Sequence, residues 1–344
     1  MWLIDRLRNR SEADKPIVND SSAPLASVLI RSMDRPSLQR ALRSAARQTW
    51  PNVEIVVVAA CGRSHRQLPE TILGRSVRLV FPDPDSRIPR PQAANACLEA
   101  ANGEWLNFLD DDDELLPDHL ATLLNAPRPA GERLVYSTAR VNDKRGKPIA
   151  RVGQPGHHLQ LYFHSRSAFS AMAVHRSLVD EGVRFDPEFL VHEDHDFQIA
   201  CAARTQFLFV DAITCLWNAQ VGDSGCGFGS NDNPRQRIET VTRIRQKWES
   251  TLNRWLRNID ALTMAGKFYL DARDFPAALE CLERALAKRG NDANVLNLCA
   301  MANLASGDDA RAELLIKRAL RRLPRHPLLR ENLEKIHNAR RGLA

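Results

Sequence analysis

Short apolar runs alternate with helix-period segments through the first third of this chain, and this alternation restricts the fold more than any other feature. Strands connected through helices form right-handed βαβ units in a mostly parallel sheet. The sequence therefore predicts an α/β domain with a Rossmann-like sheet. The strands and helices predicted for this part are, in chain order, Ala26–Ser32, Pro36–Thr49, Val53–Ala60, Val77–Phe81, Pro91–Ala101 and Trp105–Leu109.

The middle of the chain is less regular. It contains a predicted strand at Leu134–Thr138 with hairpin material up to Arg151, and a predicted helix near Asp194–Arg204. The glycine-rich segment Gln220–Asn233 is typical of a mobile loop. One long polar helix over Pro234–Ile259 is then predicted to link this part to the C-terminal third.

The last third contains an internal repeat with a period of 34 residues. Leu262, Gly266, Ala278, Leu282 and Ala285 recur as Leu296, Ala300, Ala312, Ile316 and Ala319. This period resembles that of tetratricopeptide (TPR) repeats, in which small residues let paired helices approach closely. The resemblance implies an all-α domain that binds a partner. The alternative is a generic helical hairpin that stabilises the fold and binds nothing.

These patterns divide the chain into four parts. We expect an N-terminal tail at 1–23, the α/β domain at 24–232, a linker helix at 233–259 and the TPR-like domain at 260–344. The tail lacks the long apolar stretch of a secretory signal. No apolar run approaches the roughly 18 residues that span a bilayer. We therefore expect no transmembrane segment, although peripheral membrane contact stays open.

Charge and cysteine content exclude several classes of protein. The formal net charge of +6 comes from the C-terminal part, because residues 233–344 carry +9 and the rest carries −3. No aromatic-studded basic strand accompanies this charge, so no nucleic-acid partner is expected. Seven scattered cysteines without a Cys-x-x-Cys pair argue against a disulfide framework or a zinc site. They favour a reducing, cytoplasmic environment.

Four consecutive aspartates, Asp110 to Asp113, follow the last predicted strand directly. Each pair of like charges at about 4 Å costs around 1 kcal/mol even in water, so a cation among them would be stabilising. Hard oxygen ligands suit Mg²⁺ or Mn²⁺. Strand alternation is expected to keep Asp110 and Asp112 on one side while the chain stays extended. The alternative is an acidic turn that caps a helix starting near Pro117.

The surroundings of the aspartates resemble a known family. Residues 93–117, with the upstream segments 28–36 and 48–58 and the downstream segment 185–197, are similar to the motifs of the inverting family 2 glycosyltransferases of GT-A fold. The motifs appear in the family's order, and the resemblance covers residues 24–220. It implies a GT-A-type, Rossmann-like sheet and a metal-dependent transfer of a sugar from a nucleotide-sugar donor to an acceptor hydroxyl.

The resemblance also implies roles for individual residues. Asp110 and Asp112 match the metal-binding D-x-D pair, which would hold Mn²⁺ or Mg²⁺, and Asp194 matches the catalytic base. Glu193 and Trp217 are expected on the acceptor side, and an acidic N-terminal cap is the alternative role for Glu193 and Asp194. The residues expected to bind the nucleotide sugar are Ser32, Asp34, Arg35, Ala60, Arg90, Asn95 and Asp111.

The chain departs from the family pattern where the family reads the nucleotide. Ala59 and Ala60 stand where the family has acidic residues, and Ala94 replaces an arginine that faces the diphosphate. Arg87 or Arg90 is expected to compensate for that arginine. The acceptor is expected to be a glycan or a protein recruited by the TPR-like helices. The alternative is a catalytically inactive GT-A-like scaffold that acts through those helices.

Overall fold

The computed structural model describes residues 22–165, 167–219 and 233–342 of the chain. Most of the predicted tail, at 1–21, lies outside the described residues, as does most of the predicted glycine-rich loop, at 220–232. None of the described helices combines the length and apolar character that crossing a bilayer requires.

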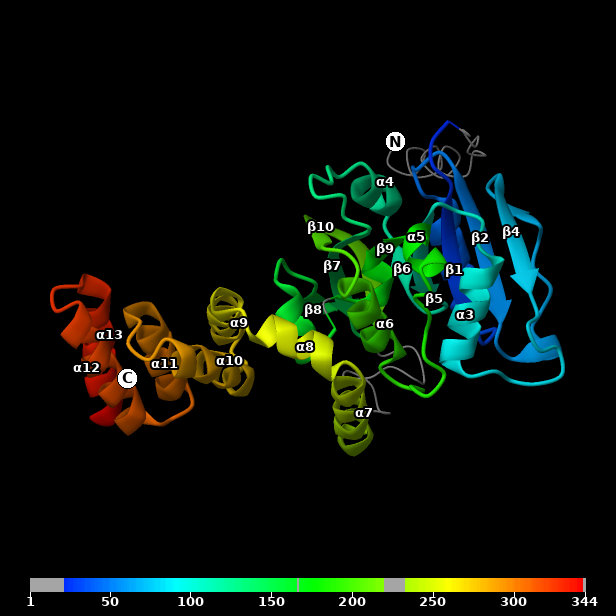
Figure 1. Ribbon diagram of the computed structural model, residues 1–344. Helices are drawn as coiled ribbons and strands as arrows, with labels where there is room; N and C mark the ends of the chain where they lie inside the picture. The colour runs from blue at the N-terminus through cyan, green and yellow to red at the C-terminus, as the bar shows by residue number, and fades with distance from the viewer. Residues whose placement is uncertain (1–21, 166, 220–232, 343–344) are drawn as a thin grey trace, which may run out of the picture. The chain divides into compact units, whose positions relative to one another are not determined.

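The chain folds into two compact units, which we call unit 1 and unit 2 (Figure 1). Unit 1 contains the residues up to Pro155 together with His164–Lys247. Unit 2 contains Gly156–Phe163 and the residues from Trp248 onward. The predicted order of an α/β domain followed by an all-α region is confirmed.

Unit 1 is built on a ten-stranded sheet with the order β3-β4-β2-β1-β5-β9-β7-β10-β6, in which β8 pairs with β7. The pairs β1–β2, β1–β5, β2–β4 and β7–β10 are parallel, so the predicted mostly parallel sheet is confirmed. The strands are β1 Ala26–Ser32, β2 Val53–Ala59, β3 Thr71–Ile72, β4 Arg75–Val80, β5 Trp105–Asp110, β6 Glu114–Leu115, β7 Leu134–Asn142, β8 Pro148–Val152, β9 Met172–His175 and β10 Phe207–Asn218.

Helices cover the sheet of unit 1. The buried side chains of α2 and α4 join Val28 and Ile30 of β1 in one apolar cluster. Because side chains alternate along a strand, Arg31 projects from the opposite face of the sheet, toward α3 and α6. The helices of this unit are α2 Leu38–Ala46, α3 Arg90–Ala100, α4 His119–Leu124, α5 Arg176–Asp180, α6 Glu193–Ala202 and α7 Pro234–Lys247.

The prediction of one long helix over 234–259 is wrong. The chain forms α7 and then a second helix, α8, at Glu249–Leu256, and the two are separated at Trp248. The ammonium group of Lys247, the last residue of α7, donates to Asp186 and Asp196 of unit 1 at 2.8 Å each. Tertiary contacts therefore hold α7 to unit 1, whereas α8 packs within unit 2. The twelve-residue strand β10 was also not predicted.

Unit 2 consists of helix pairs that repeat every 34 residues, as predicted. Both ends of α11 lie 34 positions after those of α9, and α12 follows α10 in the same way. A Cβ atom added to Gly266 would lie 2.4 Å from Cγ of Leu282, so a small residue is needed where α9 and α10 meet. Assignment to the TPR family stays a prediction. The helices are α9 Ile259–Asp271, α10 Phe275–Lys288, α11 Ala293–Ala305, α12 Asp309–Arg322 and α13 Pro327–Arg340.

A short segment from the middle of the chain completes the core of unit 2. Leu159 is fully buried in the same apolar cluster as the helix pairs. The ring of Phe163 meets that of Tyr269 with centroids 5.0 Å apart, and the rings of His158 and Trp255 lie 5.4 Å apart. Residues 156–163 thus pack against helices that follow them by about a hundred residues. No sequence pattern predicted this.

Candidate active site

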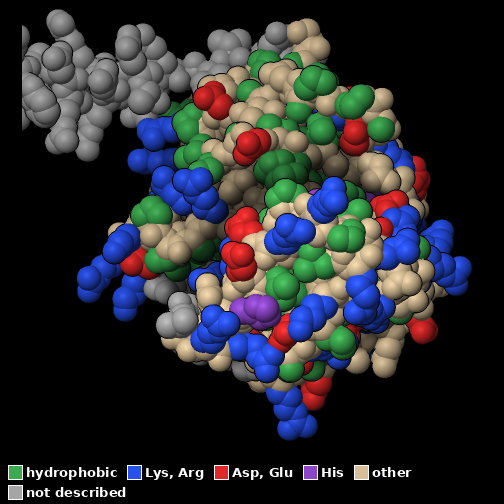
Figure 2. Space-filling model, turned by 90° about the vertical axis from the view of Figure 1, so that its left-hand side faces the viewer, with side chains coloured by type: hydrophobic (Ala, Val, Ile, Leu, Met, Phe, Trp, Pro, Cys, Tyr) green, Lys and Arg blue, Asp and Glu red, His purple; other side chains and the backbone are tan. Residues whose placement is uncertain are grey.

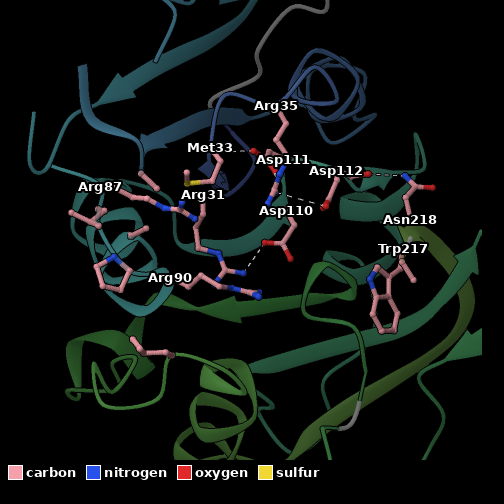
Figure 3. A pocket seen from close by; sticks show the side chains of 16 residues that line it. Arg31, Met33, Arg35, Arg87, Arg90, Asp110, Asp111, Asp112, Trp217 and Asn218 are labelled. Atoms are coloured by element: carbon pink, nitrogen blue, oxygen red, sulfur yellow. Dashed lines mark hydrogen bonds and ion pairs between the residues drawn. The ribbon is translucent and has the colours of Figure 1, made fainter. Parts of the chain in front are cut away.

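A pocket of about 280 Å³ opens in unit 1 at the carboxyl ends of β1, β2, β5 and β10 (Figure 3). Carboxyl ends of parallel strands meet at one edge of a sheet, where ligands of such folds bind. The start of α3 closes one side of the pocket with arginines, and Trp217 and Asn218 line the other side. Its lining includes Arg31, Met33, Arg35, Ala60, Arg87, Arg90, Asp110, Asp111, Asp112, Leu190, Trp217 and Asn218.

The aspartates occupy a turn rather than an extended run. The main-chain nitrogen of Asp113 donates to the main-chain oxygen of Asp110 at 3.0 Å, so the chain turns as soon as β5 ends. The expectation of an extended chain from Asp110 to Asp112 is therefore wrong. The turn nevertheless brings Asp110, Asp111 and Asp112 to the wall of one pocket.

Asp110 and Asp111 are each held by an arginine. Oδ1 of Asp110 accepts from Nη2 of Arg31 at 2.6 Å. Burial opposes ionisation of Asp110, but Arg31 and then Arg90 hold its pKa below the usual value. Asp111 is 1% exposed and accepts from Nη1 of Arg35 at 2.6 Å and from the main-chain nitrogen of Met33 at 2.9 Å. Burial still raises the pKa of Asp111.

Asp112 is the least compensated of the three carboxylates that line the pocket. Burial, and then the charges of Asp110 and Asp111, raise its pKa to about 6. Among the described residues, Arg35 is the one cation within 4 Å of its carboxylate, with an N–O distance of 3.8 Å. Asp113 points away from the pocket and accepts from the main-chain nitrogen of Asn218 at 2.8 Å. Asp113 therefore fastens the turn to the end of β10.

Arg31 connects the aspartate turn to the start of α6. Its Nη1 donates to Oε1 of Glu193 at 2.7 Å while its Nη2 donates to Asp110. Nε of Arg90 lies 3.0 Å from the same Oε1. Glu193, which was expected on the acceptor side, is 1% exposed and has its carboxylate between these two guanidinium groups. The buried network thereby fixes the position of the first turn of α6 relative to the pocket.

The predicted base, Asp194, is the next residue of α6. Burial, and then the charge of Glu193, raise the pKa of its carboxyl group. No hydrogen bond or ion pair joins its carboxylate to any other residue in the described part of the chain. Asp194 does not itself line the pocket, and its link to the pocket runs through Glu193, Arg31 and Arg90. A carboxylate with a raised pKa and no donor is suited to accept a proton.

The residues predicted to bind the nucleotide sugar fall into two groups. Arg35, Ala60, Arg90 and Asp111 line the pocket, as does Trp217 from the predicted acceptor side. The other three do not line it, and each contacts a neighbouring residue. Oγ of Ser32 lies 2.8 Å from Nε2 of His65, the carboxylate of Asp34 pairs with Arg66, and the side chain of Asn95 bonds both main-chain polar groups of Phe185.

The pocket lining also includes residues for which no role was predicted, among them Arg31, Leu190 and Asn218. The signal for Arg31 was present in the sequence, because an arginine interrupts an otherwise apolar strand at its carboxyl end. Arg87, proposed as a substitute for the arginine missing at 94, does line the pocket. Ala94 is fully buried and does not reach it.

The pocket partly fits a divalent cation. Among the residues that the structure describes, no three His, Cys, Asp or Glu side chains form a cluster suited to a metal ion. Mg²⁺ is commonly held by one or two carboxylates, with substrate phosphates and waters as its other ligands, so two aspartates suffice. The poorly compensated charge of Asp112, beside Asp110 and with only the distant Arg35 near it among the described residues, is the feature of this site that fits such an ion.

Comparison with protein families matches residues 27–173 to the family described as glycosyl transferase family 2. The chain is 30% identical over 103 residues to a putative colanic acid biosynthesis glycosyl transferase, WcaA, of Escherichia coli, a match that covers 29% of this chain and 37% of the relative. It is 29% identical over 187 residues to the succinoglycan biosynthesis protein ExoO of Rhizobium meliloti, covering 49% and 53%. The chain thus spans about half or less of each relative.

Solved structures with a similar arrangement include residues 1–349 of S. aureus TarS. The similarity has a TM-score of 0.44 at 15% identity and covers 92% of each chain. The same fragment in complex with UDP-GlcNAc gives a TM-score of 0.42 at 15% identity, again covering 92% of both chains.

Proposed function

We propose, from the match of residues 27–173 to the family 2 glycosyltransferases, that this chain transfers a sugar from a nucleotide-sugar donor to an acceptor hydroxyl. The observation that carries the proposal is the pocket in which three aspartates face the arginines of β1 and the start of α3. The reaction we propose is metal-dependent and inverts the anomeric centre.

In the proposed site, arginines bind the diphosphate of the donor and aspartates bind the divalent cation. Arg90 is the first residue of α3 and Arg87 lies just before it, and both line the pocket, which supports a role for them in binding the diphosphate oxygens. Arg35 keeps the buried Asp111 in place, and Arg31 bonds one carboxylate oxygen of the more exposed Asp110. The other oxygen of Asp110 and the carboxylate of Asp112 are the groups that would hold Mn²⁺ or Mg²⁺. When bound, the ion would neutralise the charge that develops on the departing diphosphate.

The nucleotide is proposed to lie toward the end of β2. Ala60 lines the pocket there without a polar side chain, so the base is read by shape rather than by a carboxylate. Ser32 and Asp34 support this wall through His65 and Arg66. Asn95 clamps Phe185 and thereby holds the segment that leads to α6.

Asp194 is the proposed base. It removes the proton from the acceptor hydroxyl as that oxygen attacks the anomeric carbon opposite the leaving diphosphate. A single displacement of this kind inverts the configuration. Glu193 is a positioning residue, because its carboxylate is committed to Arg31 and Arg90. Trp217 is proposed to contact the acceptor across the pocket, and the helical repeats of unit 2 to recruit a glycan or protein acceptor.

A catalytically inactive scaffold is the second candidate. Its support is the loss of polar side chains at Ala59, Ala60 and Ala94, which removes contacts that the resemblance implied. The retained carboxylates and arginines of the pocket favour the enzyme over this candidate.

The test is the substitution Asp194→Asn, assayed as nucleoside diphosphate release from a panel of nucleotide sugars with Mn²⁺. A general base contributes roughly 10²–10⁴-fold to rate, so we expect release to fall by that factor while donor binding is kept. Asp180→Asn, at an exposed carboxylate of the same unit, is the matched control. Full activity of Asp194→Asn would remove the base assignment, and a wild type that releases no diphosphate would favour the scaffold.

A further inference from the structure

A second concentration of charge lies in unit 2, at residues 314–330, which we call the basic patch. These residues include six Lys or Arg side chains and no Asp or Glu. They form the second half of α12, the connection to α13 and its first turn. Figure 2 shows one face of the molecule, on which basic side chains are more frequent than acidic ones.

Most residues at the C-terminal end of the basic patch are exposed to solvent, including apolar ones. Of residues 321–330, only Leu329 is buried. Three leucines of the patch are exposed, Leu314 by 59% and both Leu323 and Leu328 by 46%. Leu323 and Leu328 thus expose apolar side chains within the same short segment as Arg321, Arg322 and Arg325.

Three of the arginines in the patch have no neighbour that compensates their charge. In the described part of the chain, no ion pair or hydrogen bond involves the side chains of Arg321, Arg322 or Arg325. Other arginines of unit 2 do form ion pairs, such as Arg311 with Glu283 at 2.6 Å and Arg289 with Asp260 at 2.9 Å. Among the described residues the side chains of Arg257, Arg273 and Arg341 of unit 2 also form none, so what distinguishes the basic patch is that three such arginines lie within five residues of one another.

A hollow of about 610 Å³ adjoins the patch between α12 and α13. It is open to solvent and combines cationic with apolar walls. The residues that line it are Lys317, Leu320, Arg321, Pro324, Arg330 and Leu333.

We infer that the basic patch docks unit 2 onto the surface of a membrane that contains anionic lipids. The arginines contact the phosphate-bearing headgroups, and Leu323 and Leu328 enter the boundary between headgroups and acyl chains. Lys and Arg side chains near an anionic bilayer each add to binding, and apolar side chains add the area that they bury.

Two observations favour a lipid surface over a purely helix-stabilising role or an acidic protein partner. Arg321 and Arg322 lie in the last turn of α12, where cations stabilise a helix, but Arg325 lies beyond that helix and gains nothing from its dipole. An acidic protein would complement the arginines, yet it would leave the leucines beside them without an apolar partner. A membrane surface satisfies both kinds of side chain at once.

The experiment is flotation of the full chain with vesicles. We expect binding to vesicles of phosphatidylcholine mixed with phosphatidylglycerol, and none to phosphatidylcholine alone. Binding should weaken steeply as salt is added, because the attraction is electrostatic. Inorganic phosphate should displace the protein no better than chloride at equal ionic strength, since a site for free phosphate would behave otherwise.

Variants locate the binding surface. Arg321→Gln, Arg322→Gln and Arg325→Gln together should lower affinity for the anionic vesicles by roughly a hundredfold. The matched control removes three exposed cations from unit 1, as Lys144→Gln, Arg145→Gln and Arg151→Gln, and should keep wild-type affinity. Leu323→Ser with Leu328→Ser should weaken binding and leave its salt dependence in place.

Three outcomes would overturn the inference. They are absence of wild-type binding to anionic vesicles, equal binding to neutral and anionic vesicles, and an equal loss in the control triple variant. If the wild type does not bind vesicles but binds polyglutamate, the partner of the basic patch is an acidic protein and not a membrane. Because no donor or acceptor is present, none of these results depends on the proposed sugar transfer.

Discussion

The two units of this protein differ in whether they bury charged side chains or leave them exposed to solvent. Every buried Lys, Arg, Asp or Glu side chain among the described residues belongs to unit 1, and the described part of unit 2 buries none. These residues are Arg31, Arg75, Asp111, Asp113, Glu193 and Asp196. In unit 2 the longest segment without Asp or Glu, residues 314–330, instead exposes all of its arginines but the half-buried Arg318.

The buried charged side chains of unit 1 are not explained by packing and stability alone. Burying a charge costs several kcal/mol unless it is paired and hydrogen-bonded, so a buried network indicates a requirement other than stability. Arg75 is an exception with a structural role, because its guanidinium donates to the main-chain oxygens of Gln48, Trp50 and Pro51. Arg31, Asp111 and Glu193 differ from it, since their charges pair with each other or with residues that line one pocket.

The substitution Arg31→Gln should cause the largest loss of stability, because it removes a charge from the buried network of unit 1. It leaves Asp110 and Glu193 without the guanidinium that compensates both, and removal of one partner from a buried ion pair costs about 3–5 kcal/mol. Urea unfolding at neutral pH measures the loss. Arg322→Gln in unit 2 is the control and should change the free energy of unfolding by less than about 0.5 kcal/mol. Similar changes for the two variants would refute the assignment of Arg31.

A pH series tests the buried polar network on the other face of the sheet. His119 lies between Asn107 and Thr214, and burial lowers its pKa to about 3. Below the ordinary value near 6.5, the unfolded chain binds a proton that the folded chain excludes, so stability falls as pH falls. The wild-type free energy of unfolding should therefore drop by about 1.4 kcal/mol per pH unit more steeply than that of His119→Gln between pH 6 and 4. Parallel curves for the two proteins would contradict the neutral, buried state.

The close packing of α9 against α10 in unit 2 predicts a smaller change in the free energy of unfolding. In Gly266→Ala the new Cβ meets Leu282, and overpacking of this kind costs about 1–3 kcal/mol. The higher helix propensity of alanine offsets roughly 1 kcal/mol of that cost. Gly290→Ala is the matched control, because the nearest atom to its Cβ would be 3.7 Å away. If thermal unfolding shows Gly266→Ala to be more stable than Gly290→Ala, the helices do not approach as closely as described.

The parts of the fold that the sequence predicted are those set by local patterns. Strands β1, β2 and β5 begin and end within one residue of their predicted bounds, because each is an apolar run between turn residues. The 34-residue period likewise predicted the helix pairs of unit 2. Of the residues predicted for the candidate site, Asp110 and Asp112 from the motif and Arg90 from just before the predicted helix do line the pocket, while their roles stay predictions.

What the sequence could not predict depends on contacts between distant residues. Arg31 and Glu193 are 162 positions apart, and neither shows by itself that the two form an ion pair. The break at Trp248 follows from where Lys247 is held rather than from a helix-breaking residue. The insertion of residues 156–163 into unit 2 required a partner surface that only the folded helices provide.

The proposed function depends on the aspartate turn of unit 1 binding a nucleotide sugar together with a divalent cation. Calorimetric titration of the full chain with a panel of nucleotide sugars, with and without Mn²⁺, tests this for the wild type and Asp112→Asn. We expect at least one donor to bind the wild type only when Mn²⁺ is present, and Asp112→Asn to lose this binding. A wild type that binds no donor, or an Asp112→Asn variant that binds as tightly as the wild type with Mn²⁺, would contradict the proposal.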